Sequence, residues 1–345
     1  MSTDPIRAHR SVPTAAADPS ASSTRPSHLA ARREQISFLS AGQRCDGWVY
    51  QPAGPGPHPC LVMAHGLGGV RGGVLPDIAA CFAAAGIAIL VFDYRYSGTS
   101  AGLPRGLVDI SKQRDDYRAA VAYARRFRGV DARRIALWGT SFSGGHVLSV
   151  AAEDPGIAAA IIQNPFVDGR CTAAAAIRSA GRLGVARLTW EGLRDQLRRR
   201  LGWNPHRVAL VGPPGTVALI TTPDAVPGYQ RILPTDLAGW EAAVPARIVL
   251  QMRNDRPALR AQHVVCPLLV CVCDHDDISP AAAAARVVAR APRAELRRYP
   301  IGHFDIFTQP WLDQVVGDQI GFLRRTLLIH TADDSENSSA TEPSP

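Results

Sequence analysis

The chain has 345 residues, 46% of them hydrophobic, and a net charge of +8 at pH 7. This length is enough for one large domain or two ordinary ones, with a sizeable core. The longest apolar stretches, such as residues 87–92 and 267–273, have the length of strands and are far too short to cross a bilayer. The composition therefore excludes a membrane span.

Both ends of the chain have a composition typical of disorder. Residues 1–33 lack the apolar central region of a secretory signal, and Asp4, Asp18 and the prolines argue against an organellar targeting peptide. Residues 330–345 are acidic, with four acids and no base from Thr331 onward. We expect two disordered tails around a folded core.

The seven cysteines form no CxxC pair and no Cys/His spacing suited to a metal. Cys271 and Cys273 share one face of an apolar strand, where cysteine usually behaves as a small buried hydrophobe. We expect reduced thiols, a cytoplasmic protein and no metal site.

Between the tails, apolar runs alternate with segments of helical periodicity. We expect helices at about residues 75–85 and 113–127, from about residue 143, from residue 280, and at the end through residue 322. The expected strands cover residues 35–40, 46–50, 60–65, 86–93, 134–139, 157–165, 267–273 and 295–300. Strands separated by helices predict an α/β fold with a mostly parallel sheet and helices on both of its faces.

One long segment breaks this rhythm. Residues 167–262 are rich in Arg, Trp and Pro, and their first half reads as helical. The segment is too long for an ordinary loop. We interpret it as an inserted helical cap that divides the core into residues 34–166 and 263–329.

The strongest local signal is the run Gly139-Thr140-Ser141-Phe142-Ser143-Gly144-Gly145 between an apolar strand and a helix. A strand-to-helix turn this tight strains its central residue and requires small neighbours, so it lifts the Ser141 hydroxyl out of the sheet edge. Ser143 stands where G-x-S-x-G has its second glycine, and serine is small enough for that position. The alternative is a glycine-rich turn with an incidental serine.

The context favours a nucleophile. His65-Gly66-Leu67-Gly68-Gly69 follows an earlier buried strand, so the amides of Leu67 and Phe142 are the expected oxyanion hole. His65 is more often a structural histidine in such a loop, and we assign it no proton transfer. Asp276 and His303 follow the next-to-last and last strands, where a carboxylate and an imidazole can meet beside Ser141.

With these motifs the chain resembles the α/β-hydrolase superfamily, in particular lidded esterases that are dienelactone-hydrolase-like or serine-peptidase-like. The resemblance rests on HGLGG, FDYRYSGTS, GTSFSGG, DHDDISP and GHF and covers most of residues 35–327 apart from the insert. It implies a triad of Ser141, Asp276 and His303. Asp274 and Asp277 are near alternatives for the acid, and Asp168 is a rival because some members of the family carry the acid after the sixth strand.

A serine nucleophile predicts acyl transfer from a small-molecule ester or thioester, without a cofactor. Two alternatives stay open, an acyltransferase or thioesterase that acts on an acyl carrier and an inactive hydrolase fold that serves as a binding module.

The segment from Arg170 to Arg207 contains nine arginines and only two acidic residues, which gives it a local net charge of +7. One interpretation is that this segment binds nucleic acid or a membrane surface. We favour the other, a helix whose charged face is solvated and whose Leu193, Leu197 and Leu201 turn inward. The sequence leaves the oligomeric state open.

Overall fold

The computed structural model describes residues 32–233 and 240–328. The first strand begins at Arg32, so the expected N-terminal tail is two residues too long at its inner end. The rest of both expected tails lies outside the described residues.

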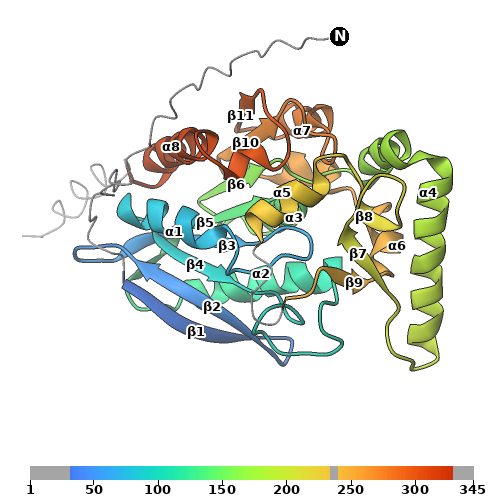
Figure 1. Ribbon diagram of the computed structural model, residues 1–345. Coiled ribbons are helices and arrows are strands. Elements are labelled where there is room, and N and C mark those ends of the chain that lie inside the picture. Colours follow the sequence, from blue (N-terminus) through green and yellow to red (C-terminus); the bar gives the residue numbers. More distant parts are fainter. Residues whose placement is uncertain (1–31, 234–239, 329–345) are drawn as a thin grey trace, which may run out of the picture.

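Within the described residues, eight strands form a central sheet in the order β1-β2-β4-β3-β5-β6-β10-β11 (Figure 1). The first two pairings, β1 with β2 and β2 with β4, are antiparallel, and every later pairing is parallel. The mostly parallel sheet is confirmed. Its strands are β1 (Arg32–Ser40), β2 (Gln43–Gln51), β3 (His58–Ala64), β4 (Ala88–Phe92), β5 (Val130–Thr140), β6 (Ala159–Gln163), β10 (Leu268–Cys273) and β11 (Ala294–Tyr299).

Helices cover both faces of this sheet. On one face α1 (Leu75–Ala84) and α8 (Trp311–Leu323) belong to the same hydrophobic cluster as Leu61 and Met63 of β3. On the other face α2 (Ile110–Ala124), α3 (Phe142–Ala151) and α7 (Ala281–Val288) belong to the cluster that contains Val62. Successive residues of a strand point to opposite faces, so a strand with two covered faces is apolar throughout. This explains why the central strands read as unbroken hydrophobic runs.

The segment between β6 and β10 is only partly helical. Its first half is the long helix α4 (Gly169–Arg200), as expected, but its second half contains a small sheet that the sequence did not predict. That sheet has the order β8-β7-β9 and consists of β7 (Arg207–Val211), β8 (Ala218–Ile220) and β9 (Ala243–Pro245). The remaining short helices of the structure are α5 (Ala225–Ile232), α6 (Ile248–Met252), η1 (Pro257–His263), η2 (Asp305–Phe307) and η3 (Arg324–Leu328).

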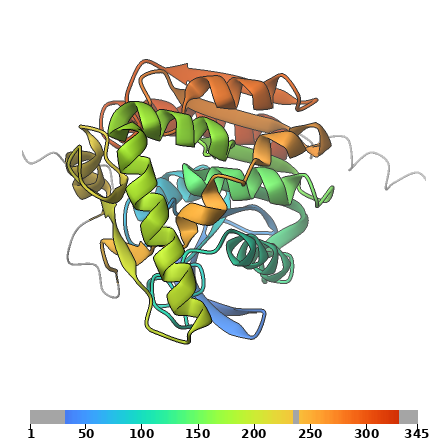
Figure 2. The ribbon, with the colours of Figure 1, turned by 90° about the vertical axis from the view of Figure 1, so that its right-hand side faces the viewer.

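Helix α4 consists of two limbs that meet at Gly181, whose φ of 72° and ψ of 167° are not helical (Figure 2). The longer limb packs inward through Gly192, whose Cα lies beside Ala246 O and Leu250, and through Asp195, which is fully buried and paired with Arg247. A small residue and a buried ion pair thus fix this helix to the rest of the insert, at Ala246, Arg247 and Leu250.

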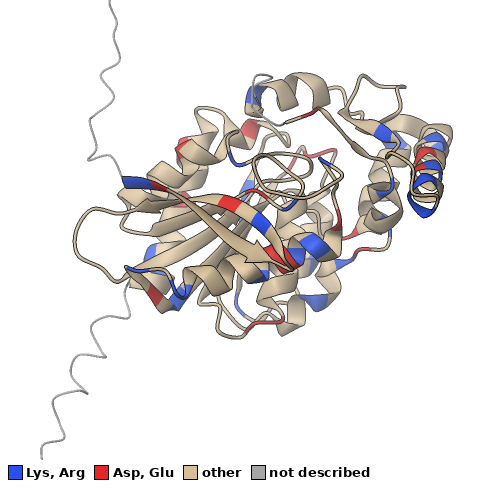
Figure 3. Ribbon diagram, turned by 90° about the horizontal axis from the view of Figure 1, so that it is seen from below, with Lys and Arg blue, Asp and Glu red and all other residues tan. Residues whose placement is uncertain are grey.

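The outward face of α4 differs from our expectation. Leu193, Leu197 and Leu201 are 50%, 57% and 51% exposed, so the expectation that they turn inward is wrong. The position of Gly192 and Asp195 decides this, because it turns the leucines to the opposite side of the helix. Most arginines of residues 170–207 lie on this same helix, where Figure 3 shows them in blue.

Candidate active site

Ser141 lies at the turn between β5 and α3 with φ 52° and ψ −119°, a conformation that a residue with a side chain rarely adopts. The turn is held by Ser141 N, which donates to Gln163 O, and by Ser141 O, which accepts from Gly144 N and Phe166 N. The neighbours are small for a steric reason. A Cβ at Gly139 would lie 2.5 Å from Ser143 O, and one at Gly144 would lie 2.7 Å from the Pro165 side chain.

Ser143 braces this turn. Its fully buried hydroxyl accepts a hydrogen bond from Thr140 N (2.8 Å) and donates toward Ala64 O (3.0 Å) at the end of β3. The serine that departs from G-x-S-x-G therefore ties the turn to the neighbouring strand, a function that a glycine could not perform.

Replacing Ser143 by alanine leaves the buried Thr140 amide without its acceptor. We expect the free energy of unfolding to fall by about 1–3 kcal/mol, the usual cost of such an orphaned group. Urea denaturation of Ser143→Ala beside the wild type measures this. An unchanged stability would show that the hydroxyl is dispensable to the turn.

Asp276 and His303 are brought together by the loops after β10 and β11. His303 Nδ1 lies 2.6 Å from Asp276 Oδ2, and both side chains are buried. The second carboxylate oxygen of Asp276 accepts from Ile278 N (2.8 Å) and Ser279 N (2.7 Å). The carboxylate is therefore fixed in one orientation, with one oxygen toward the backbone and the other toward the imidazole.

The other candidate acids have different partners. Asp168 caps α4 and pairs with Arg256 (3.2 Å). Its burial opposes ionisation, but the hydrogen bonds from Arg256 and two backbone amides outweigh burial and lower the pKa of Asp168. Asp274 pairs with Arg298 (2.7 Å), and Asp277 is exposed. Only Asp276 among the four contacts His303.

Asn164 connects the two halves of the site, and the sequence analysis missed it. Its Oδ1 accepts from Thr140 Oγ1 (2.8 Å) beside the serine, and its Nδ2 donates to His303 O (2.9 Å). Asn164 itself has a positive φ of 34°. The sequence feature that could have indicated it is an asparagine directly after β6 and before Pro165, because asparagine tolerates a positive φ better than most residues.

Leu67 and Phe142, the residues expected to supply the oxyanion amides, line one cavity together with Ser141. Within the described residues neither amide donates a hydrogen bond to another protein group. The loop that carries Leu67 is held from the insert, because Tyr229 Oη donates to Leu67 O (2.6 Å) and Trp240 Nε1 donates to Gly68 O (2.8 Å). Neither contact could be predicted from the sequence, because nothing local to Tyr229 or Trp240 indicates it.

Two histidines are buried close to the site. His65 Nδ1 lies 2.9 Å from Gly66 O, and His146 Nε2 lies 2.9 Å from Gln113 Oε1. Burial lowers the pKa of His65 and lowers the pKa of His146 well below its usual range. Both are therefore neutral at pH 7, which agrees with a structural role for His65.

These two histidines predict an acid-sensitive fold. Below about pH 6.5 the unfolded chain takes up protons on them while the folded chain resists, so stability is lost as the pH falls. The free energy of unfolding, measured by urea denaturation, should decrease from pH 7 to pH 5, with a slope of at most about 1.4 kcal/mol per pH unit for each histidine. His146→Gln should make the slope shallower. A slope that is unchanged in this variant would contradict the assignment.

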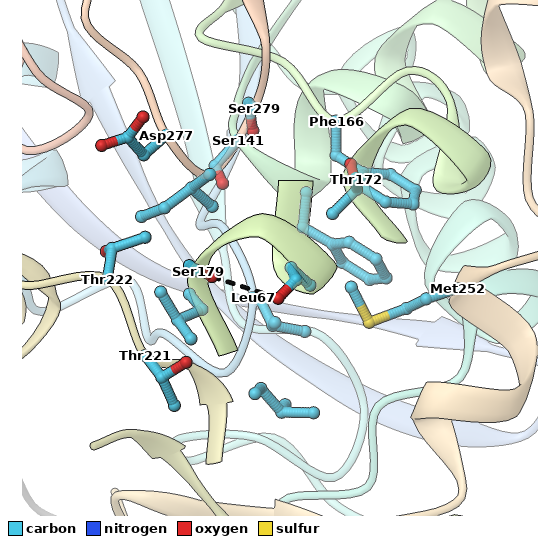
Figure 4. Close-up of a pocket in the computed structure, with 15 residues that line it drawn as sticks. Leu67, Ser141, Phe166, Thr172, Ser179, Thr221, Thr222, Met252, Asp277 and Ser279 are labelled. Atoms are coloured by element: carbon cyan, nitrogen blue, oxygen red, sulfur yellow. Dashed lines mark hydrogen bonds between the residues drawn. The ribbon is translucent and has the colours of Figure 1, made fainter. Parts of the chain in front are cut away.

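Two cavities, each of about 60 Å³, have Ser141 in their walls and also share Leu67 and Ile220. The aromatic-lined cavity contains His303 and is otherwise mainly apolar, with Tyr229, Phe304 and Phe307 in its wall. The hydroxyl-lined cavity contains five hydroxyl side chains besides Ser141 (Figure 4), namely those of Thr172, Ser179, Thr221, Thr222 and Ser279. Residues of the insert thus complete the walls of both cavities, and none of the nine arginines of residues 170–207 lines either one.

No cluster of metal-ligating side chains occurs among residues 32–233 and 240–328. In the same ranges no helix has the length and apolar character needed to cross a membrane.

An eight-stranded, mostly parallel sheet with a serine at a strained strand-to-helix turn and a histidine–carboxylate pair after the last two strands is the architecture of the α/β-hydrolases. A family model described as serine aminopeptidase, S33, matches residues 55–211. The chain is 40% identical over 292 residues to the quorum-quenching protein AidA of Acinetobacter baumannii, covering 84% of this chain and 94% of that protein. The chain belongs to the α/β-hydrolase family and is a hydrolase.

Two fungal relatives match over shorter stretches. The thiohydrolase aneE of Aspergillus aculeatus is 38% identical over 135 residues, which is 39% of this chain and 42% of that protein. The polyketide transferase grgF of a Penicillium species is 35% identical over 137 residues, which is 39% of this chain and 46% of that protein. The crystal structure of GrgF superimposes with a TM-score of 0.71 and 23% identity over 86% of this chain and 99% of that one, which shows the shared fold.

Proposed function

We propose that the protein is a serine hydrolase that cleaves a carboxylic ester or thioester through an acyl-enzyme on Ser141. His303 is the base and Asp276 the acid of this proposed triad. The observation that carries the proposal is the buried 2.6 Å contact between His303 Nδ1 and Asp276 Oδ2, in a site where His303 and the strained Ser141 line one cavity.

The geometry supports a definite proton path. With its Nδ1 proton donated to Asp276, His303 presents a free Nε2 that accepts the Ser141 proton as Oγ bonds to the substrate carbonyl carbon. The amides of Leu67 and Phe142 stabilise the negative charge on the carbonyl oxygen. His303 then returns the proton to the alcohol or thiol as its bond to carbon breaks. A water molecule repeats the sequence and releases the acid.

Transfer to another acceptor is the second candidate. It is favoured by the relatives named thiohydrolase and polyketide transferase, whose names place both thioester cleavage and acyl transfer among similar proteins. The two reactions share the acyl-enzyme and differ only in whether water or another nucleophile attacks it.

A substrate panel distinguishes these candidates. It contains p-nitrophenyl esters of rising chain length, acyl-CoA thioesters, and ester- and lactone-containing signalling compounds, the last because the AidA relative is named for quorum quenching. Turnover in water alone indicates hydrolysis, whereas turnover that requires an added alcohol or amine indicates transfer. No turnover and no labelling of Ser141 by a fluorophosphonate would favour the third candidate, an inactive binding module.

We also propose that residues 167–262 act as a cap domain and that the protein works in the cytoplasm. The first proposal is supported by the insert residues that line both cavities. The second is supported by the seven cysteines, all of which are unpaired. Burial raises the pKa of the Cys60 and Cys271 thiols to about 12, so these two stay protonated and unreactive.

A further inference from the structure

The longer limb of α4 carries a row of exposed apolar side chains along the outside of the molecule (Figure 2). Isolated apolar side chains on a surface are ordinary, but a continuous row on one helix marks a surface that contacts a partner. The five side chains of this row are each between 50% and 65% exposed, and we call them the outer stripe: Leu183, Trp190, Leu193, Leu197 and Leu201.

The spacing of the outer stripe is that of two paired helices. Leu183, Trp190 and Leu197 are seven residues apart and Leu193 follows Trp190 by three, which is the a and d pattern of a helix pair. At 100° per residue the five side chains cover an arc of about 80°. A helix that packs on an extended apolar surface has a stripe of about 100° or more, whereas a narrower stripe is typical of a helix pair. The outer stripe therefore fits a second helix better than a lipid surface.

Exposed arginines lie on both sides of the outer stripe. At 100° per residue Arg187 and Arg194 lie along one side, and Arg182 and Arg200 lie along the other. Arg194 has Glu191 at 3.7 Å, and the other three have no ion pair within the part of the chain that the structure describes. These are the e and g positions of the helix pair, whose charges select the partner.

The two acidic residues of α4 are engaged elsewhere. Glu191 lies closest to His206, whose Nε2 is 2.6 Å away, and Asp195 is buried in its pair with Arg247. The helix itself therefore leaves the positive charge beside the outer stripe largely uncompensated.

A second copy of this chain does not complement that charge. If two α4 helices pair antiparallel about Trp190, Arg187 of one copy faces Arg194 of the other. If they pair in parallel, Arg182 of one copy faces Arg187 of the other. Like charges placed opposite each other oppose association. The flanking arginines instead require acidic side chains at the facing positions of the partner.

We propose that the outer stripe and its flanking arginines bind an amphipathic helix of another protein, in which glutamate or aspartate borders the apolar face. Burial of Trp190 and the leucines stabilises the complex, and the pairs between arginine and carboxylate select the partner. The inference concerns the outside of the insert and does not depend on the proposed reaction at Ser141.

The test uses the full chain and a fluorescein-labelled peptide of four heptads with Leu at a and d and Glu at e and g. Fluorescence anisotropy should show saturable binding of this acidic peptide and none of a basic peptide that has Lys in place of Glu. Arg187→Glu combined with Arg194→Glu should weaken binding of the acidic peptide about tenfold or more, because each reversed charge then meets a glutamate. The same variant should gain binding of the basic peptide.

The matched control is Arg126→Glu combined with Arg128→Glu. Both side chains are exposed in the turn between α2 and β5, and their reversal changes the net charge of the protein by the same amount. This variant should bind the acidic peptide as the wild type does. Thermal melting of both double variants verifies that they are folded.

Three results would overturn the proposal. The first is no binding of the acidic peptide, or equal weakening by both pairs of substitutions, which would mean that only net charge matters. The second is a dimer in light scattering that Trp190→Ala dissociates, because the outer stripe would then bind a second copy. The third is sedimentation with phosphatidylglycerol vesicles that Trp190→Ala abolishes, without binding of the acidic peptide, which would assign the outer stripe to a lipid surface.

Discussion

Ser141→Ala is expected to lower kcat by about a millionfold on whichever ester or thioester the protein turns over best. In the proposed mechanism, alanine removes the atom that bonds to the acyl carbon and leaves the amides of Leu67 and Phe142 in place. The residual rate should therefore stay roughly 10³–10⁴-fold above that of water, since those amides and substrate binding still act. Steady-state kinetics of purified wild type and variant measure the loss.

The control for this experiment is Ser143, two residues away. Labelling by a fluorophosphonate followed by peptide mass spectrometry should find the adduct on Ser141 in the wild type and in Ser143→Ala, but no adduct in Ser141→Ala. The Ser143 hydroxyl is buried and engaged with Thr140 and Ala64, so it should not react. An adduct that persists in Ser141→Ala would refute the assignment.

Asp276→Asn is expected to lower kcat by about 10⁴-fold while the protein stays folded. Ile278 N and Ser279 N donate to one oxygen of Asp276, so the amide oxygen of the asparagine must occupy that place. Its NH₂ group then faces His303 Nδ1, which has to accept, and the imidazole proton moves to Nε2. With that tautomer His303 cannot take the proton of Ser141.

The comparison for the acid is Asp168→Asn. Asp168 caps α4 and pairs with Arg256, and among the described residues it makes no contact with His303. Its replacement should change kcat little, because asparagine also caps a helix well. Thermal melting of both variants separates a loss of activity from a loss of folding. If Asp168→Asn has the larger effect on kcat, the acid lies after β6 and the assignment of Asp276 is wrong.

The sequence predicted the core of the fold because each central strand is buried on both faces and therefore consists of an unbroken apolar run. The strands expected at residues 60–65, 86–93, 134–139 and 267–273 match β3, β4, β5 and β10. The positions of the candidate site residues could be predicted for a related reason. Ser141 and Asp276 follow such strands, His303 follows the edge strand β11, and the carboxyl ends of parallel strands meet at one edge. These signals are local to the chain.

What the sequence could not supply were contacts between distant segments. The small β8-β7-β9 sheet has short strands, two of them of only three residues, which carry little periodicity. The bridge from Thr140 through Asn164 to His303, and the bonds of Tyr229 and Trp240 to the Leu67–Gly68 loop, depend on positions that only folding brings together.

The outer face of α4 was decided in the same way. Helical spacing alone predicts which of its residues share a face, and it places Leu193, Leu197 and Leu201 together. Which face turns inward depends on what the helix packs against. Here Gly192 and the buried Asp195–Arg247 pair contact the rest of the insert. The sequence by itself determined the core strands, the strand-to-helix turn at Ser141 and the chain order of the candidate site residues, because those features are local. The tertiary structure decided which aspartate meets His303, how the insert faces the site and what lines the cavities beside Ser141, because those depend on packing between segments far apart in the chain.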